Sequence, residues 1–252
     1  MEEKKLSRRV SLFIPCLVEH FLPRVGEATA KVLSRVGMEV KYPGGQTCCG
    51  QMQFKTGYQA EARKMARHFL RVFKGEDLVV SPSGSCVSMI RHHYRELFRD
   101  DPLRLSRAES LAARTFELTE FLVDVLGIDD VGAEWPGKAV YHDSCQVSRV
   151  LGVRAQPRML LSRVQRLEMV EMEHQETCCG FGGIFSLEFP VVSEKITGDK
   201  AAEVVKSGAE FVISAEPSCL LNIGGYLAKM GEKIKPVHIA EVLAHQAGEP
   251  WN

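Results

Sequence analysis

The sequence Gln46-Thr47-Cys48-Cys49-Gly50 returns 130 residues later as Glu176-Thr177-Cys178-Cys179-Gly180. Each cysteine pair stands between two single cysteines, with spacings of 32 and 37 residues in the first half and 33 and 40 in the second. Two sets of four cysteines in the same order indicate an internal duplication. We call them the first quartet (Cys16, Cys48, Cys49 and Cys86) and the second quartet (Cys145, Cys178, Cys179 and Cys219).

The repetition extends beyond the cysteines. Residues 77–86 (DLVVSPSGSC) match residues 210–219 (EFVISAEPSC), and residues 117–122 (ELTEFL) match residues 238–243 (HIAEVL). A repeat of about 130 residues has the size of a domain and is too long for a solenoid unit.

The sequence therefore predicts two tandem cysteine-rich domains, residues 1–130 and residues 138–252. The segment Trp135-Pro136-Gly137 is predicted to be the linker, because Pro and Gly favour turns.

Short β-rich runs alternate with helical patterns in each copy, which predicts the α/β class. The predicted strands are Val10–Ile14, Leu78–Ser81, Ala139–Tyr141 and Phe211–Ser214. The predicted helices cover residues 20–36, 56–74, 87–98, 115–126, 190–207, 219–230 and 238–246. We expect two tandem pseudo-symmetric domains, each a small parallel sheet with helices on both faces.

Composition excludes several classes of protein. The chain has 252 residues, and its 32 Lys and Arg balance 32 Asp and Glu, so we expect no nucleic-acid partner. The longest apolar stretches, 10–18 and 121–128, are much shorter than the ~20 residues of a membrane span. Eight cysteines in 252 residues are far fewer than a disulfide scaffold contains, so we expect a cytoplasmic protein with free thiols.

The cysteine positions predict a metal site. Cys16, Cys86, Cys145 and Cys219 each follow a predicted strand, at the sheet edge where ligands bind, and the pairs lie in glycine-bearing loops. Adjacent cysteines suit different irons of a cluster better than one tetrahedral zinc ion, which usually uses C-x₂₋₄-C. We predict that all eight cysteines bind metal, as one or two [4Fe–4S] clusters, with zinc in one domain as the alternative.

Two polar side chains near the second quartet are further candidates. His142 could carry a proton or act as a spare ligand, or it could be a hydrogen-bonded histidine at the strand end. Arg149 could hold the carboxylate of a small acid substrate, or it could be a surface arginine at the start of a helix. Gly180-Phe-Gly-Gly183 lacks the spacing of a dinucleotide fingerprint, so we expect electron transfer rather than hydride chemistry in this chain.

The pattern Cys-x₃₁₋₃₂-Cys-Cys-Gly-x₃₅₋₃₈-Cys, present twice, resembles the cysteine-rich CCG-domain family. That family includes the cysteine-rich subunits of heterodisulfide reductase and of anaerobic glycerol-3-phosphate dehydrogenase, and the iron–sulfur subunit of glycolate oxidase. Residues 83–89 (SGSCVSM), 142–145 (HDSC) and 177–183 (TCCGFGG) carry the likeness, which covers nearly the whole chain.

The resemblance implies a non-flavin, iron–sulfur electron-transfer subunit of a complex of the L-lactate dehydrogenase type, which oxidises L-lactate to pyruvate with two partner proteins. The fullest family motif ends in Cys-x-x-Cys, whereas this chain has Met89 and Asn222 at the position of the fifth cysteine. Four cysteines fit an ordinary cluster better than the non-cubane clusters of the disulfide-cleaving relatives. A thiol–disulfide reductase and a zinc-stabilised interaction module are the two alternatives.

Overall fold

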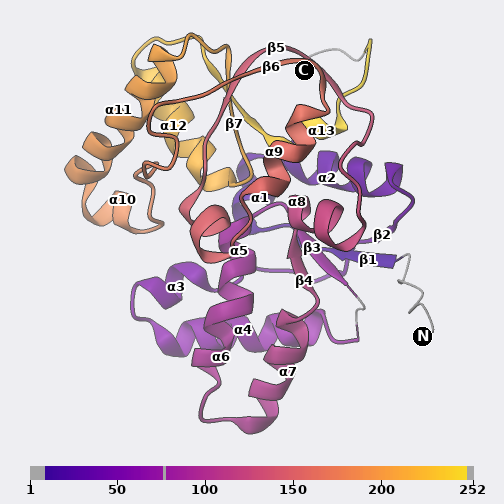
Figure 1. Ribbon diagram of the computed structural model, residues 1–252. Helices are drawn as coiled ribbons and strands as arrows, with labels where there is room; N and C mark the ends of the chain where they lie inside the picture. The colour runs from indigo at the N-terminus through magenta and orange to yellow at the C-terminus, as the bar shows by residue number, and fades with distance from the viewer. Residues whose placement is uncertain (1–8, 76–77, 249–252) are drawn as a thin grey trace.

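The computed structural model describes residues 9–75 and 78–248 (Figure 1). Two four-stranded sheets, each entirely parallel, confirm the α/β prediction. The first sheet has the order β2-β1-β3-β4 and contains β1 (Arg9–Leu12), β2 (Glu39–Lys41), β3 (Val79–Ser81) and β4 (Thr115–Glu117). The second has the equivalent order β6-β5-β7-β8 and contains β5 (Glu134–Tyr141), β6 (Gln165–Val170), β7 (Phe211–Ser214) and β8 (Lys235–His238).

Helices and π-helical turns connect the strands of both copies. In the first copy they are α1 (Cys16–Phe21), α2 (Pro23–Arg35), α3 (Gln51–Lys55), α4 (Gln59–Val72), α5 (Gly84–Ser88), η1 (Met89–His93), α6 (Tyr94–Leu97), α7 (Pro102–Ala112), α8 (Leu118–Glu120) and η2 (Phe121–Val125). In the second copy they are η3 (Gln146–Val150), α9 (Ala155–Ser162), α10 (Phe185–Glu188), α11 (Pro190–Lys206), α12 (Pro217–Lys229) and α13 (Ile239–Ala244). No helix among the described residues has the length and apolar character needed to cross a bilayer.

Local sequence explains why these segments fold as they do. In α4 the buried side chains are Ala62, Ala66 and Phe69, which share one helix face because they are four and three residues apart. All three residues of the central strand β3 are buried, as expected for a parallel strand covered on both faces. Asp101 caps α7 by accepting a hydrogen bond from the Arg104 N–H at 3.0 Å.

Several predicted boundaries differ from the structure, and three segments predicted as helix or linker form strands instead. Residues 115–117 begin the predicted helix 115–126 but form β4, because they pair with β3 and the helix starts only after the capping residue Glu117. Likewise His238 ends β8 and caps α13, which ends at Ala244 rather than at residue 246. The predicted linker 135–137 lies within β5, where Trp135 is buried and packs edge-on against Phe211.

Within residues 9–75 and 78–248, the strands β2, β4, β6 and β8, the helices α3, α7, α9 and α10 and the π-helical turn η3 were not predicted. The domain limits at residues 130 and 138 stay predictions. Asp77, the first residue of one repeated segment, lies outside the described residues.

The two copies share a continuous core. Helix α2 packs beside α13, and the short helix α8 packs against α9 (Figure 1). One apolar cluster takes buried residues from both copies, among them Leu118, Val147 and Leu243. The start of α5 approaches η3 so closely that a Cβ on Gly84 would lie 2.3 Å from Val147 Cγ2. This packing brings the carboxyl ends of the two sheets together.

Candidate metal centre between the two domains

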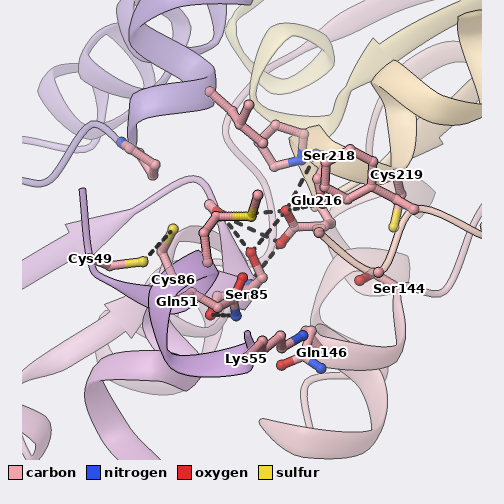
Figure 2. A pocket seen from close by; sticks show the side chains of 18 of the residues that line it. Cys49, Gln51, Lys55, Ser85, Cys86, Ser144, Gln146, Glu216, Ser218 and Cys219 are labelled. Atoms are coloured by element: carbon pink, nitrogen blue, oxygen red, sulfur yellow. Dashed lines mark hydrogen bonds between the residues drawn. The ribbon is translucent and has the colours of Figure 1, made fainter. Parts of the chain in front are cut away.

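One cavity of about 290 Å³ lies where the carboxyl ends of the sheets meet (Figure 2). All eight cysteines of the two quartets line it. The single cysteines reach the cavity from the turns and helix starts that follow β1, β3, β5 and β7, as the sequence pattern predicted. The structure thus brings both quartets to one cavity, while their role as ligands stays a prediction.

The thiols of the first quartet contact one another in series. Cys49 Sγ lies 3.4 Å from Cys86 Sγ, and Cys48 exchanges hydrogen bonds with the thiols of Cys16 and Cys49. The Gly50 N–H donates to Cys48 Sγ at 3.3 Å. Gly50 has φ +86°, a left-handed conformation that glycine adopts without strain.

The second quartet repeats this arrangement. Cys178 forms thiol hydrogen bonds with Cys145 and with Cys179, which in turn contacts Cys219. The Gly180 N–H donates to Cys178 Sγ at 3.4 Å, and Gly180 has φ +84°. Backbone N–H groups aimed at sulfur are typical of sites that hold thiolates.

Protons are shared unequally within each quartet. The hydrogen bond from Cys16, then that from Cys49 and the N–H groups of Gly50 and Gln51, lower the pKa of Cys48 to about 3. The hydrogen bond to Cys48, followed by burial, raises the pKa of Cys16 well above its ordinary value. A bound metal would displace the shared protons, because metal ligation requires thiolates. Four convergent thiols with backbone donors therefore fit a metal or an iron–sulfur cluster.

His142 is buried and lies beside the second quartet, on the side away from the cavity. One of its ring nitrogens lies within 4.8 Å of the sulfur atoms of Cys179 and Cys219, and the side chain is 1% exposed. Neither ring nitrogen has a hydrogen-bond partner among the described residues, so the geometry does not match a hydrogen-bonded histidine at a strand end. Burial, with a smaller contribution from Lys200, lowers the pKa of His142 to about 3, which keeps the imidazole neutral at pH 7.

Arg149 is exposed on η3 and donates a hydrogen bond to the Cys145 thiol. Its proposed contact with a substrate carboxylate stays a prediction. Lys55, which the sequence reasoning did not single out, is a second exposed cation and lines the cavity at the end of α3 (Figure 2).

A carboxylate joins the two copies at the centre of the cavity. Glu216 caps α12, and its side chain accepts hydrogen bonds from the Ser85 N–H at 2.7 Å and from Ser218 Oγ at 2.8 Å (Figure 2). Ser85 belongs to α5 of the first copy, so one carboxylate connects the helix that carries Cys86 to the helix that carries Cys219. Burial raises the pKa of Glu216, while the hydrogen bonds from Ser85 and Ser218 oppose that shift.

The two positions that hold a fifth cysteine in the fullest family motif have structural roles here. Met89 is completely buried in an apolar cluster with Phe13 and Phe69. Asn222 donates hydrogen bonds of 2.8 Å to the Cys179 carbonyl and to Thr197 Oγ1. Neither side chain carries a sulfur that could act as a fifth thiolate, so each quartet keeps four thiols.

The family model described as the cysteine-rich domain (CCG) matches residues 10–91 and 139–224, one copy each. The chain belongs to this CCG cysteine-rich domain family.

Over most of its length the chain is similar to lactate utilization protein A of several bacteria. It is 50% identical to that of Exiguobacterium sp. over 93% of this chain and 96% of the relative. It is 46% identical to that of Bacillus subtilis over 93% of this chain and 98% of the relative. The crystal structure of a hypothetical protein from Helicobacter pylori shares the fold, with a TM-score of 0.65 at 10% identity over 96% of this chain; the match spans 49% of that protein.

Proposed function

We propose that this protein is the iron–sulfur electron-transfer subunit of a cytoplasmic complex that oxidises L-lactate to pyruvate together with two partner proteins. The observation that carries the proposal is the pair of thiol quartets facing one cavity. The lactate part rests on the relatives named lactate utilization protein A, which match the chain nearly end to end.

In this proposal the first quartet holds one [4Fe–4S] cluster and the second quartet holds another. When bound, the clusters supply one-electron transfer. The chain would provide four thiolates to each cluster. It also provides backbone N–H donors from Gly50 and Gly180 and a partly enclosed cavity. L-lactate loses two electrons and two protons on becoming pyruvate, and a partner provides the group that accepts them first.

Metal analysis of anaerobically purified protein tests the electron-transfer role. We expect about eight irons and about eight acid-labile sulfides per chain, with an EPR signal that appears on dithionite reduction. Iron absent from fresh anaerobic protein would overturn the proposal.

Growth of a deletion strain tests the lactate role separately. We expect a strain that lacks this protein to grow on glucose and to fail on L-lactate as sole carbon source. Wild-type protein should restore growth, whereas the Cys178→Ser variant should not. Normal growth of the deletion strain on L-lactate would contradict the metabolic assignment and leave the cluster assignment intact.

One observation favours zinc in the second domain as an alternative. His142, Cys179 and Cys219 form a nitrogen and sulfur donor set of the kind that zinc binds. About four irons with one zinc per chain would support this alternative, and zinc alone would indicate a metal-stabilised interaction module.

A further inference from the structure

The duplication allows the residues behind the two quartets to be paired. Phe13 and His142 each stand three residues before the first cysteine of their quartet. The helices behind the cysteine pairs align as well, because the Ala62 carbonyl faces Gly50 as the Ser193 carbonyl faces Gly180.

This alignment places Lys200 of α11 at the position that Phe69 occupies in α4, each seven residues after the aligned carbonyl. The fifth-cysteine positions, Met89 and Asn222, form a third pair.

The wall behind the first quartet is apolar. Phe13 and Phe69 are fully buried with ring centroids 4.7 Å apart, and Met89 is buried in the same cluster. The Tyr94 hydroxyl reaches the quartet from this side and donates to the Cys49 carbonyl at 2.9 Å. These four side chains therefore offer the first quartet no positive charge.

The wall behind the second quartet is polar and carries a cation. Lys200 has 0% exposure, and its ammonium donates to the carbonyls of His174 at 2.6 Å and Gln175 at 3.2 Å, just before the cysteine pair. Its charge acts on the thiols of Cys178 and Cys179. His142 adds an imidazole whose nitrogens have no other partner in the described part of the chain.

Nearby charges do not cancel this difference. Lys55, the exposed cation that lines the cavity from the first copy, is matched by the exposed Arg149 beside Cys145, and solvent screens both. Asp143 also faces Lys200, but it is held by Arg158 through two hydrogen bonds of 2.8 and 2.7 Å. Glu203, the other acid near Lys200, is only partly buried and is screened by solvent. Glu216 is bonded to both copies and therefore acts on both quartets.

A buried cation and N–H donors stabilise the more negative, reduced state of an iron–sulfur centre, and net charge and hydrogen bonds to sulfur set its potential. The geometry points to His142 and Lys200 as the side chains that make the second centre the easier of the two to reduce. This inference rests on the proposed iron–sulfur function. One electron would leave the reduced first centre and enter the oxidised second centre, with no bond made or broken.

An anaerobic redox titration followed by EPR tests the inference, with Cys48→Ser and Cys178→Ser variants assigning each signal to its quartet. We expect the second centre to become reduced at a higher potential than the first. Lys200→Met and His142→Phe, the latter copying the first quartet's residue, should each lower the midpoint of the second centre and leave the first unchanged. Lys200→Arg should keep the midpoint close to the wild-type value.

Lys195→Met is the matched control, because Lys195 lies on the same helix but is exposed and paired with Asp199. It should shift neither midpoint. Two results would overturn the inference and leave the proposed function intact. One is a midpoint potential of the second centre equal to or lower than that of the first; the other is a second-centre midpoint unchanged by both Lys200→Met and His142→Phe. Should Lys200→Met fail to fold, His142→Phe still decides the question. Wild-type protein without iron and sulfide would overturn the proposed function and the inference together.

Discussion

The two halves of the cavity hold their cysteines with the same main chain and with different side chains. In each half a glycine at positive φ follows the cysteine pair and donates its N–H to the first sulfur of that pair, at 3.3 Å from Gly50 and 3.4 Å from Gly180. The carbonyl of the second cysteine is also fixed in both halves. Tyr94 holds it in the first, and Asn222 holds it in the second, where the Thr197 hydroxyl lies 3.0 Å away.

This comparison shows which features the duplication preserved. The loop conformation and the sulfur positions depend on glycine and backbone hydrogen bonds, so they could stay fixed while neighbouring side chains changed. The residues behind the sulfur atoms changed in kind, from the aromatic Phe69 to the cationic Lys200. The arrangement of the cysteines is thus common to both halves, and their electrostatic surroundings are not.

The largest effect is expected when one cysteine of a single quartet is replaced. Cys178→Ser should abolish the EPR signal of the second centre and about half of the iron, because a four-thiolate site loses a ligand. Cys48→Ser should do the same to the first centre only. Iron analysis and EPR on the two variants measure both effects. If either substitution removed both centres, the quartets would form one shared site.

The glycines after the cysteine pairs should respond unequally to alanine. A Cβ at Gly180 would lie 2.4 Å from Thr197 Oγ1 and 2.7 Å from the Ser193 carbonyl, whereas a Cβ at Gly50 would lie no closer than 3.1 Å to Met65 Cβ. Both substitutions also carry the strain of positive φ. We expect Gly180→Ala to lower the free energy of unfolding by about 4 kcal/mol and Gly50→Ala by about 2 kcal/mol.

Urea unfolding of the apo-protein measures both values. Gly37→Ala, which has φ +84° and open space around its Cβ, isolates the backbone strain. Equal losses for Gly50→Ala and Gly180→Ala would show that the close approach at Gly180 is relieved by movement of α11.

The sequence was sufficient to predict the duplication, the parallel α/β class and the cysteines that face the cavity, because these depend on local patterns. The missed strands β2 and β6 are sheet edges with no fully buried residue, so they lack the apolar run that marks a central strand. Strands β4 and β8 lead directly into capped helices, so the helical pattern extended over them.

The residues behind the quartets were much harder to predict. Lys200 lies on a helix with other lysines, and its burial depends on packing against a loop 25 residues earlier in the chain. Tyr94 contacts a carbonyl 45 residues away. Only an alignment of the two copies could have revealed the exchange of Phe69 for Lys200. Whether the quartets face one cavity depends on contacts between domains that neither copy encodes alone.

A further test uses one pair of equivalent positions that should respond to pH in opposite directions. Glu117 and His238 are both buried caps, of α8 and α13. Burial, opposed by the hydrogen bond from Thr119, raises the pKa of Glu117 from 4.5 to about 7. Burial lowers the pKa of His238 from 6.5 to about 4.

The raised pKa means that folding favours protonated Glu117, so its contribution to stability is present at pH 4.5 and is lost as the pH rises through 7. The lowered pKa of His238 gives a contribution present above pH 6.5 that is lost as the pH falls towards 4. Glu117→Gln should therefore gain up to about 3 kcal/mol relative to wild type as the pH rises, and His238→Gln should gain as the pH falls. Urea unfolding from pH 4.5 to pH 8 measures both trends, and parallel trends in the two variants would contradict the assignment.

The smallest expected effect concerns the carbonyls of the second cysteine in each pair. The buried Cys49 carbonyl accepts a side-chain hydrogen bond from Tyr94, so Tyr94→Phe should lower the free energy of unfolding by about 1–2 kcal/mol. The Cys179 carbonyl accepts from Asn222 at 2.8 Å, and the Thr197 hydroxyl divides its one proton between this carbonyl at 3.0 Å and the nearer Ser193 carbonyl at 2.7 Å. Thr197→Val leaves the Asn222 bond in place and should cost about 0.5 kcal/mol. Urea unfolding of the apo-protein gives both numbers. If Thr197→Val lowered the free energy of unfolding as much as Tyr94→Phe does, Asn222 alone would not be enough to fix the Cys179 carbonyl. The second half would then depend on Thr197 as the first half depends on Tyr94.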